Sequence, residues 1–421
     1  MTTARVVPGP VRGTVRAPPS KSYTHRALVA GAMTGRLHRI LDPLDSVDTI
    51  ATAEGLLPLG VGVDRGRTEW TVRPSSPRGS EVRCGASGTT LRFLLPVAAR
   101  LDRTTRFTGD PVLLRRPIEP LLRFLRVAGA RVSARSGSRR SISVAGPIHG
   151  SRAPVDGSES SQFVSGLLLS LPTLGSPSTM DLRGRTVSRP YIEATLRVLA
   201  HHGVTIHEST RAVRVPAPQP FRARTLRVPG DASSAAYLWA AAAVSAGRVR
   251  VGGLDPAWPQ ADLAILPILR EMGASVVVRG PTVEVAGPIA TPTEADLTAS
   301  PDLLPLVSVL AAAVAGTSIW TGAAHATGKE SNRRRESGRL ARAMGATVRV
   351  SPRRFEVRGT ARPTGMRFHA PADHRVVMSA AVGALGAAGP SSIAGAEHVA
   401  KSFPEFWATL SELGGEVVLL P

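Results

Sequence analysis

The sequence predicts an α/β fold built from six repeats of about 70 residues, because two different phrases each recur six times along the chain. The 421 residues are 43% hydrophobic and 20% charged, a composition that can bury a large core and differs from that of disordered chains. At about 100–200 residues per domain, this length indicates two to four domains, or two large ones made of repeated units.

The first phrase is an amphipathic helix that ends in glycine and leads into β-branched residues, as in ILREMGASV and LARAMGATV. Glycine supplies the left-handed conformation that ends a helix, and the valines and isoleucines that follow favour a strand. The spacings between these glycines are 69, 74, 70, 72 and 69 residues. They are Gly60, Gly129, Gly203, Gly273, Gly345 and Gly414.

The second phrase is a small polar or acidic residue followed by a nearly uncharged Ala/Leu-rich stretch, as in GDASSAAYLWAAAAV. A helix that is apolar on all sides is a buried helix, and the residue before it is its N-cap. Short runs such as Thr347 to Val350 and Arg354 to Val357 alternate valine or phenylalanine with other residues and predict half-exposed strands. Any α/β protein contains helix–glycine–strand transitions, but two phrases in step six times favour a repeated β-α-β-α-β-β unit.

Positive charges at the starts of the buried helices predict an anionic ligand. Lys21, Arg26 and the pair His374–Arg375 lie in first turns, where a cation opposes the helix dipole unless an anion is near. Helix N-termini also present backbone N–H groups to anions.

The basic residues are almost all arginines. The net charge is +21, and of 52 basic residues only Lys21, Lys329 and Lys401 are lysines. Lysine carries a compact charge and can exchange protons, so these positions are candidates for chemistry, although codon drift could also leave three by chance. A nucleic-acid-binding protein is the alternative that the charge suggests. The aromatic content of 4% and the dispersed arginines argue against it.

Acid–base chemistry has candidates in Asp302 and Glu330, which lie in different repeats. Neither a metal site nor a cofactor motif is expected: the single cysteine, Cys84, is interpreted as a packing residue, and His201–His202 as surface residues of an amphipathic helix. The N-terminal residues lack the apolar core of a signal peptide, and no apolar run is long enough to span a bilayer. We therefore expect a cytoplasmic protein with no membrane role.

With these motifs in place, the chain resembles the EPSP synthase (3-phosphoshikimate 1-carboxyvinyltransferase) family over nearly its full length. PSKSYTHRA is similar to the family segment P-x-S-K-S-x-x-x-R, GASGTTLR to its G-N-A/S-G-T-x-x-R loop, and KESNR to K-E-T-D-R. RRPI, SSQF, VSRPY, the DHR triplet and AKSFP also match family motifs. All three lysines fall on active-site positions of the family, which removes most of the case for chance.

The resemblance implies roles residue by residue. It implies a catalytic set of Lys21, Asp302, Glu330 and His374. The implied shikimate 3-phosphate ligands are Lys21, Ser22, Arg26, Ser160, Ser161, Gln162, Ser188, Tyr191, Asp302 and Lys329. The implied phosphoenolpyruvate ligands are Lys21, Gly88, Thr89, Arg116, Gln162, Arg333, Arg375 and Lys401.

The family fold implies a two-domain inside-out α/β barrel of six βαβαββ repeats with the active site in the interdomain cleft. Residues 20–229 would form the shikimate 3-phosphate side, and residues 1–19 with 230–421 would form a second domain that completes the phosphoenolpyruvate site. The implied activity is transfer of the enolpyruvyl group to the 5-hydroxyl of shikimate 3-phosphate by a monomer without cofactors or metal.

The sequence departs from the family motifs at Ala86, Asn332, Ala372 and His325. Because these positions surround the catalytic ones, they bear on binding more than on chemistry. A divergent paralogue, a pseudoenzyme with the same fold, and UDP-N-acetylglucosamine enolpyruvyl transferase are the enzyme-like alternatives. The last of these carries a cysteine in a mobile loop of its first half, whereas Cys84 lies in the GASGTT turn.

Overall fold

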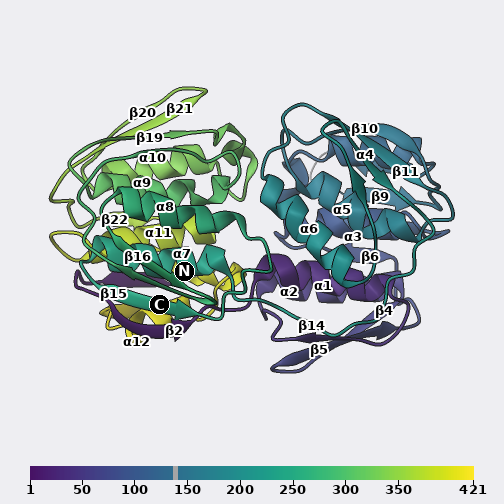
Figure 1. Ribbon diagram of the computed structural model, residues 1–421, viewed down its shortest axis with the longest axis horizontal. Helices are drawn as coiled ribbons and strands as arrows, with labels where there is room; N and C mark the ends of the chain where they lie inside the picture. The colour runs from purple at the N-terminus through teal and green to yellow at the C-terminus, as the bar shows by residue number, and fades with distance from the viewer. Residues whose placement is uncertain (136–140) are drawn as a thin grey trace. The chain divides into compact units, whose positions relative to one another are not determined.

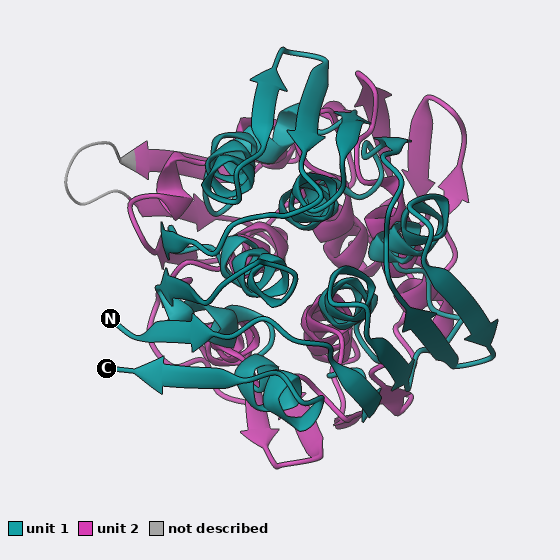
Figure 2. Ribbon diagram, turned by 90° about the vertical axis from the view of Figure 1, so that its left-hand side faces the viewer, with its two compact units in different colours: residues 1–18, 230–421 teal, residues 19–229 magenta. Residues whose placement is uncertain are grey.

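The computed structural model describes residues 1–135 and 141–421. The chain divides into two compact units, which we call unit 1 (residues 1–18 and 230–421) and unit 2 (residues 19–229) (Figure 2). In each, the helices lie toward the centre and strand pairs toward the outside (Figures 1 and 2).

Within the described residues, each unit has three four-stranded sheets with one shared topology. Two neighbouring strands run parallel and the other two pairings are antiparallel. In unit 2 the sheets are β14 (Leu226–Arg227), β3 (His38–Leu41), β5 (Glu69–Pro74), β4 (Val61–Arg65); β6 (Glu81–Arg83), β7 (Thr104–Thr108), β9 (Ser141–Ala145), β8 (Arg131–Arg135); and β10 (Arg152–Asp156), β11 (Ser178–Arg183), β13 (Ala212–Val215), β12 (His207–Glu208). In unit 1 they are β2 (Arg12–Arg16), β15 (Arg248–Gly252), β17 (Thr282–Ala286), β16 (Ser275–Arg279); β18 (Glu294–Asp296), β19 (Gly316–Thr321), β21 (Arg354–Gly359), β20 (Thr347–Val350); and β22 (Arg367–His369), β23 (Ser391–Ala394), β1 (Thr3–Val6), β24 (Val417–Leu420).

Three of these sheets take a strand from a distant part of the chain. β14 pairs in parallel with β3, β2 pairs in parallel with β15, and β1 lies between β23 and β24. In the other three sheets the strands follow one another as β-α-β-α-β-β. The repeated unit predicted from the sequence is therefore confirmed, and sequence-distant strands complete the remaining copies.

The helices divide into two groups, as predicted. The buried group comprises α1 (Lys21–Met33), α3 (Gly88–Ala98), α5 (Gln162–Ser170), α7 (Ala232–Val244), α9 (Leu304–Ala312) and α11 (His374–Leu385). Within unit 2, α1, α3 and α5 pack against one another, and α7, α9 and α11 do so within unit 1. The amphipathic group comprises α2 (Val47–Leu56), α4 (Glu119–Val127), α6 (Arg189–His201), α8 (Ile265–Glu271), α10 (Arg333–Ala343) and α12 (Phe406–Glu412). Short 3-10 helices are η1 (Leu57–Leu59), η2 (Leu113–Arg115), η3 (Leu171–Thr173), η4 (Ala261–Ala264), η5 (Pro301–Leu303), η6 (Ala324–Gly328) and η7 (Ala396–Lys401).

The six glycines that punctuate the repeats all adopt the left-handed conformation, with φ between 76° at Gly203 and 106° at Gly129. Only glycine enters this region without steric cost, so each one ends an amphipathic helix and redirects the chain into a strand. Among residues 1–135 and 141–421, no helix combines the length and apolarity that crossing a bilayer requires.

Candidate active site

In unit 2, the predicted catalytic Lys21 forms an ion pair with a carboxylate that the sequence analysis did not single out. Lys21 is the first residue of α1, and its Nζ lies 3.1 Å from Oδ2 of Asp48 in the first turn of α2. Asp48 is nearly buried, with a side chain 5% exposed, whereas that of Lys21 is 17% exposed. The ammonium group is thus held in place while remaining accessible to a ligand.

Arg26 is buried one turn further along α1 and joins this helix to α6. Its Nε donates to the Thr195 hydroxyl at 2.8 Å, and its Nη2 to the Tyr191 carbonyl oxygen at 2.8 Å. A third donor, Nη1, reaches the Ser22 carbonyl at 2.8 Å, and burial lowers the pKa of the guanidinium to about 10. Three predicted residues, Ser22, Arg26 and Tyr191, therefore meet, with much of the hydrogen-bonding capacity of Arg26 used inside the protein.

The first turn of α3 brings together most of the predicted phosphoenolpyruvate ligands of unit 2. A Cβ atom added at Gly88 would lie 3.1 Å from Arg116 Nη1 and 3.2 Å from Arg92 Nη1, so both guanidinium groups lie against this residue. Gln162 links the same cluster, because its Nε2 donates to Thr89 Oγ1 at 2.9 Å and its Oε1 accepts from Arg92 at 2.7 Å. Arg92, the last residue of the GASGTTLR motif, has no role in the sequence prediction and is nevertheless a central member of this group.

Apart from Ser22 in α1, the serines of the predicted shikimate 3-phosphate set lie at two helix starts in unit 2. Ser161 precedes α5 and is buried, and the Ser160 hydroxyl accepts from the Gln162 backbone N–H at 3.2 Å. Ser188 is the N-cap of α6 and adopts a left-handed conformation with φ of 54°, which is uncommon for a residue with a side chain. Strain of this kind clusters at functional sites.

A chain of buried hydrogen bonds connects three helices beneath these residues. His25 Nδ1 lies 2.7 Å from Thr52 Oγ1, Thr52 lies 2.6 Å from Thr90 Oγ1, and Thr90 donates to the Ser87 hydroxyl at 2.7 Å. Burial, and then the charge of Lys21, lower the pKa of His25 well below 6.5, so the ring is neutral. This chain fixes the first turn of α3 relative to α1 and α2, and its members are too far apart in sequence to be identified by spacing.

In unit 1, one buried arginine is surrounded by three carboxylates. Arg333 Nη1 lies 2.6 Å from Asp302, Nη2 lies 2.6 Å from Glu330, and Nε lies 2.8 Å from Asp373. The guanidinium side chain is 1% exposed. Asp302 and Glu330, whose meeting could not be inferred from spacing, are thus brought together by Arg333.

Asp302 also contacts two further predicted residues. Lys329 Nζ lies 3.4 Å from its Oδ1, and Arg375 Nη2 lies 3.0 Å from its Oδ2. Burial alone would raise the pKa of Asp302, but the surrounding cations, Arg375 first among them, hold it well below 3.8. Asp302 is therefore ionised at neutral pH, and suited to orienting cations and hydroxyl groups more than to accepting a proton.

The remaining predicted residues of unit 1 lie on neighbouring elements. His374 is buried at the start of α11, with Nδ1 3.9 Å from Asp373 Oδ1, and Lys401 ends η7, which packs against α11. His325, the family departure in η6, has a pKa lowered to about 4 by burial and then by the charge of Lys329. A neutral imidazole therefore stands beside the Lys329–Asp302 pair.

Two of the cations predicted in first turns, Lys21 and Arg375, have protein carboxylates as partners. Lys21 is paired with Asp48, and Arg375 with Asp302 and Asp262. The dipole argument for an anionic ligand is therefore weaker than the sequence suggested, because the protein itself supplies anions. What favours a ligand is that each unit keeps a partly exposed lysine: the side chain of Lys21 in unit 2 is 17% exposed, and that of Lys329 in unit 1 is 24% exposed.

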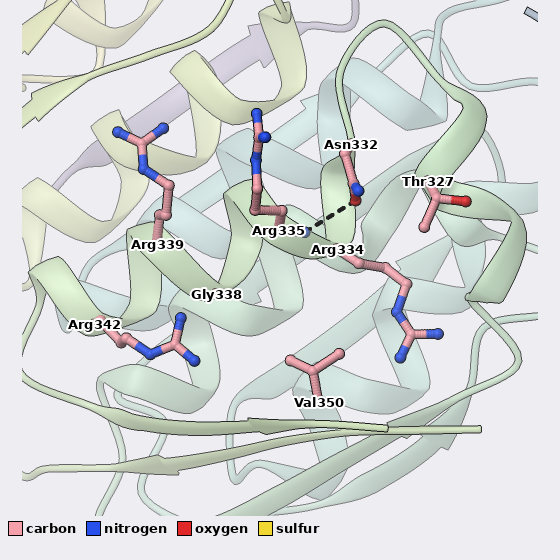
Figure 3. A pocket seen from close by; sticks show the side chains of 8 residues that line it. All are labelled: Thr327, Asn332, Arg334, Arg335, Gly338, Arg339, Arg342 and Val350. Carbon is pink, nitrogen blue, oxygen red and sulfur yellow. Dashed lines mark hydrogen bonds between the residues drawn. The ribbon is translucent and has the colours of Figure 1, made fainter. Parts of the chain in front are cut away.

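A pocket of about 350 Å³ lies away from most of these residues, between α10 and β20 in unit 1 (Figure 3). Its arginines are largely engaged by the protein: Arg334 donates to the carbonyls of Pro352 and Arg354, and Arg342 to that of Val348. Among the described residues, no group of three or more His, Cys, Asp or Glu side chains could hold a metal ion.

The interpretation of His201–His202 as a surface pair is wrong for His202. His202 follows the last residue of α6 and is 0% exposed, because its ring lies between those of His38 in β3, 5.0 Å away, and Phe221, 6.1 Å away. Cys84 is fully buried, as expected for a packing residue, and burial raises the pKa of its thiol to about 12.

Comparison with known proteins assigns the whole chain to one group. Residues 7–410 match the family model described as EPSP synthase (3-phosphoshikimate 1-carboxyvinyltransferase). The 3-phosphoshikimate 1-carboxyvinyltransferase of Methanocorpusculum labreanum is 37% identical over 412 residues, 97% of each chain, and that of Aeropyrum pernix is 40% identical over 98% of this chain and 96% of its own. In fold, the chain is similar to the solved structures of EPSP synthase from Acinetobacter baumannii (TM-score 0.82, 23% identity, all of both chains) and of the enolpyruvyl transferase NikO from Streptomyces tendae (TM-score 0.80, 18% identity, 100% and 99% of the chains).

Proposed function

Because the chain belongs to the EPSP synthase family, it transfers the enolpyruvyl group of phosphoenolpyruvate to the 5-hydroxyl of shikimate 3-phosphate, and we propose how its side chains divide this work. The products are 5-enolpyruvylshikimate 3-phosphate and phosphate, in the shikimate pathway to the aromatic amino acids. The paralogue, pseudoenzyme and UDP-N-acetylglucosamine alternatives are not favoured, because the full-length relatives carry the 3-phosphoshikimate activity in their names.

The reaction needs proton transfer in both directions. In the addition, the methylene carbon of phosphoenolpyruvate gains a proton, the 5-hydroxyl loses one, and a C–O bond forms to give a tetrahedral ketal. In the elimination, the new methyl group returns a proton and the C–O bond to phosphate breaks. We assign these transfers to Glu330 and Lys21, and assign Asp302 to orienting the hydroxyl, with His374 beside Asp373 completing the catalytic set.

Substrate binding is assigned to the remaining predicted residues. Arg116, Arg333, Arg375 and Lys401 bind the carboxylate and phosphate of phosphoenolpyruvate: the three guanidinium groups match both anions bidentately, and the Lys401 ammonium supplies a compact charge. Gly88, Thr89 and Gln162 shape the same site from α3 and α5. The shikimate 3-phosphate ligands are Ser22, Arg26, Ser160, Ser161, Ser188, Tyr191 and Lys329.

The observation that carries these assignments is the buried charge cluster around Arg333. Burying a charge costs free energy, and a stable fold is served as well or better by apolar side chains in the same space. Three carboxylates around a guanidinium 1% exposed therefore indicate selection for function. The cluster also contains Glu330, the carboxylate proposed for proton transfer, and Asp302, the carboxylate proposed to orient the hydroxyl.

A phosphate-release assay with both substrates tests the proposal. The wild type should release phosphate only when both substrates are present, and Lys21→Ala and Glu330→Ala should each abolish turnover while retaining the wild-type Tm. Turnover near the wild-type rate in either variant would refute that residue's assignment.

We further propose that the protein acts as a cytoplasmic monomer that does not bind nucleic acid. Much of its positive charge is paired on the sheets, as in Arg152 with Asp181 and in Arg248 and Arg250 with Glu284. Light scattering tests the monomer. DNA affinity that persists at physiological salt would contradict the expectation about nucleic acid.

A further inference from the structure

Asp262 is a buried carboxylate with no role in the assignments above. It lies in η4, is 1% exposed, and is flanked by Ala261 and by Leu263, which packs against the apolar core. A charged group in such surroundings is retained at a cost unless specific partners compensate it. Its partners therefore indicate what it does.

Those partners are one hydroxyl and one guanidinium. Asp262 Oδ2 accepts from the Ser233 hydroxyl on α7 and from Arg375 Nη1 at 3.4 Å. Oδ1 is buried and has no hydrogen-bond partner in the described part of the chain. Gln260, two residues earlier, anchors the segment by accepting from the Ala232 N–H at 2.8 Å and donating to the Gly230 carbonyl at 2.7 Å.

Arg375 is consequently held from two directions. Nη2 contacts Asp302 at 3.0 Å while Nη1 contacts Asp262, so that the two terminal nitrogens are each directed at a different carboxylate. Asp302 also contacts Lys329 and Arg333, whereas within residues 1–135 and 141–421 the ion pair of Asp262 is with Arg375. A change at Asp262 should therefore disturb Arg375 without also disturbing Lys329 or Arg333, as a change at Asp302 would.

We propose that Asp262 is a positioning residue for the reaction: it fixes the plane of the Arg375 guanidinium so that the remaining N–H groups of Arg375 face the anionic group of phosphoenolpyruvate. The inference rests on the proposed role of Arg375. An arginine side chain has several rotatable bonds, and holding it in the binding orientation removes an entropy cost that ligand binding would otherwise bear. Arg375 also lies in the first turn of α11, where the helix dipole disfavours a cation, and a second carboxylate offsets this.

Steady-state kinetics of Asp262→Asn test the proposal. We expect KM for phosphoenolpyruvate to rise about tenfold, the effect of losing one charge-assisted hydrogen bond. KM for shikimate 3-phosphate and kcat should stay within about twofold of the wild type. Asp255→Asn, which removes an exposed carboxylate nearby in the same loop, is the matched control and should leave all three constants unchanged.

A double-mutant cycle tests whether Asp262 changes KM for phosphoenolpyruvate through Arg375. If Asp262 acts through Arg375, adding Asp262→Asn to Arg375→Lys should raise KM for phosphoenolpyruvate far less than it does in the wild type. Equal effects in both backgrounds, or an unchanged KM in Asp262→Asn, would overturn the proposal. If Arg375→Lys leaves this KM unchanged, it is the proposed role of Arg375 that fails.

Asp262→Glu covers the case in which the asparagine variant does not fold. It keeps the charge but displaces it by one methylene group, and should also raise KM for phosphoenolpyruvate at a Tm close to the wild-type value. Wild-type kinetics in Asp262→Glu, or loss of folding in both variants, would show that the carboxylate serves only the fold.

Discussion

Replacing Gly88 with alanine should weaken phosphoenolpyruvate binding without destabilising the protein. The added Cβ would lie 3.1 Å from Arg116 Nη1, 3.2 Å from Arg92 Nη1 and 3.4 Å from Arg116 Cζ. Arg92 is held by Gln162 at 2.7 Å and by the Pro117 carbonyl at 2.9 Å. The added atom therefore requires a shift of a few tenths of an ångström in this cluster, and Arg116 lies nearest to it.

The size of the effect follows from this displacement. A misplacement of about 1 Å can cost roughly 100-fold in rate, so a shift of a few tenths should raise KM for phosphoenolpyruvate about three- to tenfold. Gly88 is the first residue of α3 and has helical geometry, where alanine is favoured over glycine by up to about 1 kcal/mol. The Tm should therefore be unchanged or slightly higher.

Steady-state kinetics with each substrate varied in turn, together with thermal unfolding, provide the measurement. Gly175→Ala is a matched control in unit 2, since an added Cβ there would meet nothing within 4 Å. An unchanged KM for phosphoenolpyruvate in Gly88→Ala would refute the placement of Arg116 against this residue. A Tm lowered by several degrees would show that the helix does not tolerate the methyl group.

Three further predictions follow from the charges. Glu330→Gln should lower kcat about 10²- to 10⁴-fold with a near-native Tm, as removal of a proton-transfer group does, and a kcat within threefold of the wild type would contradict its role. Asp48→Asn, which removes the partner of Lys21, should lower kcat/KM by about tenfold or more, whereas an unchanged value would mean that the ion pair is incidental. Burial lowers the pKa of His38 to about 3 and that of His202 to about 4. The native state therefore binds fewer protons than the unfolded state below about pH 6.5. As the pH drops from about 6.5 toward 4, the free energy of unfolding should fall by up to about 1.4 kcal/mol per pH unit for each histidine. Urea unfolding across this range checks it, and a slope unaffected by His38→Gln would exclude that histidine as a source.

Local signals in the sequence were enough to predict the repeat. Gly345 ends α10 because a left-handed residue is needed there, and Asp231 caps α7 by accepting from the Ser234 N–H at 3.1 Å. Both effects act within a few residues, so spacing and residue type reveal them. The sheets were harder to predict, because the parallel partner of β3 is β14, nearly two hundred residues away, and nothing in the two residues of β14 marks it as a strand.

In the candidate site too, the sequence identified individual residues, and only the structure showed which of them lie together. Motif resemblance selected Lys21, Asp302 and Glu330, and tertiary structure showed that Asp302 and Glu330 share the guanidinium of Arg333. The prediction for His202 was wrong because the amphipathic pattern of α6 does not reveal that the residue after the helix is covered by His38 of β3.

The sequence by itself determined the six-fold repeat, the alternation of buried and amphipathic helices, and the family motifs, since these are encoded by neighbouring residues. Only the tertiary structure decided which carboxylate accompanies each cation. The Lys21–Asp48 pair spans 27 residues and the Arg375–Asp262 pair spans 113. An ion pair depends on distance in space, and a chain that brings its helices together by long crossovers leaves no sequence spacing from which that distance could be inferred.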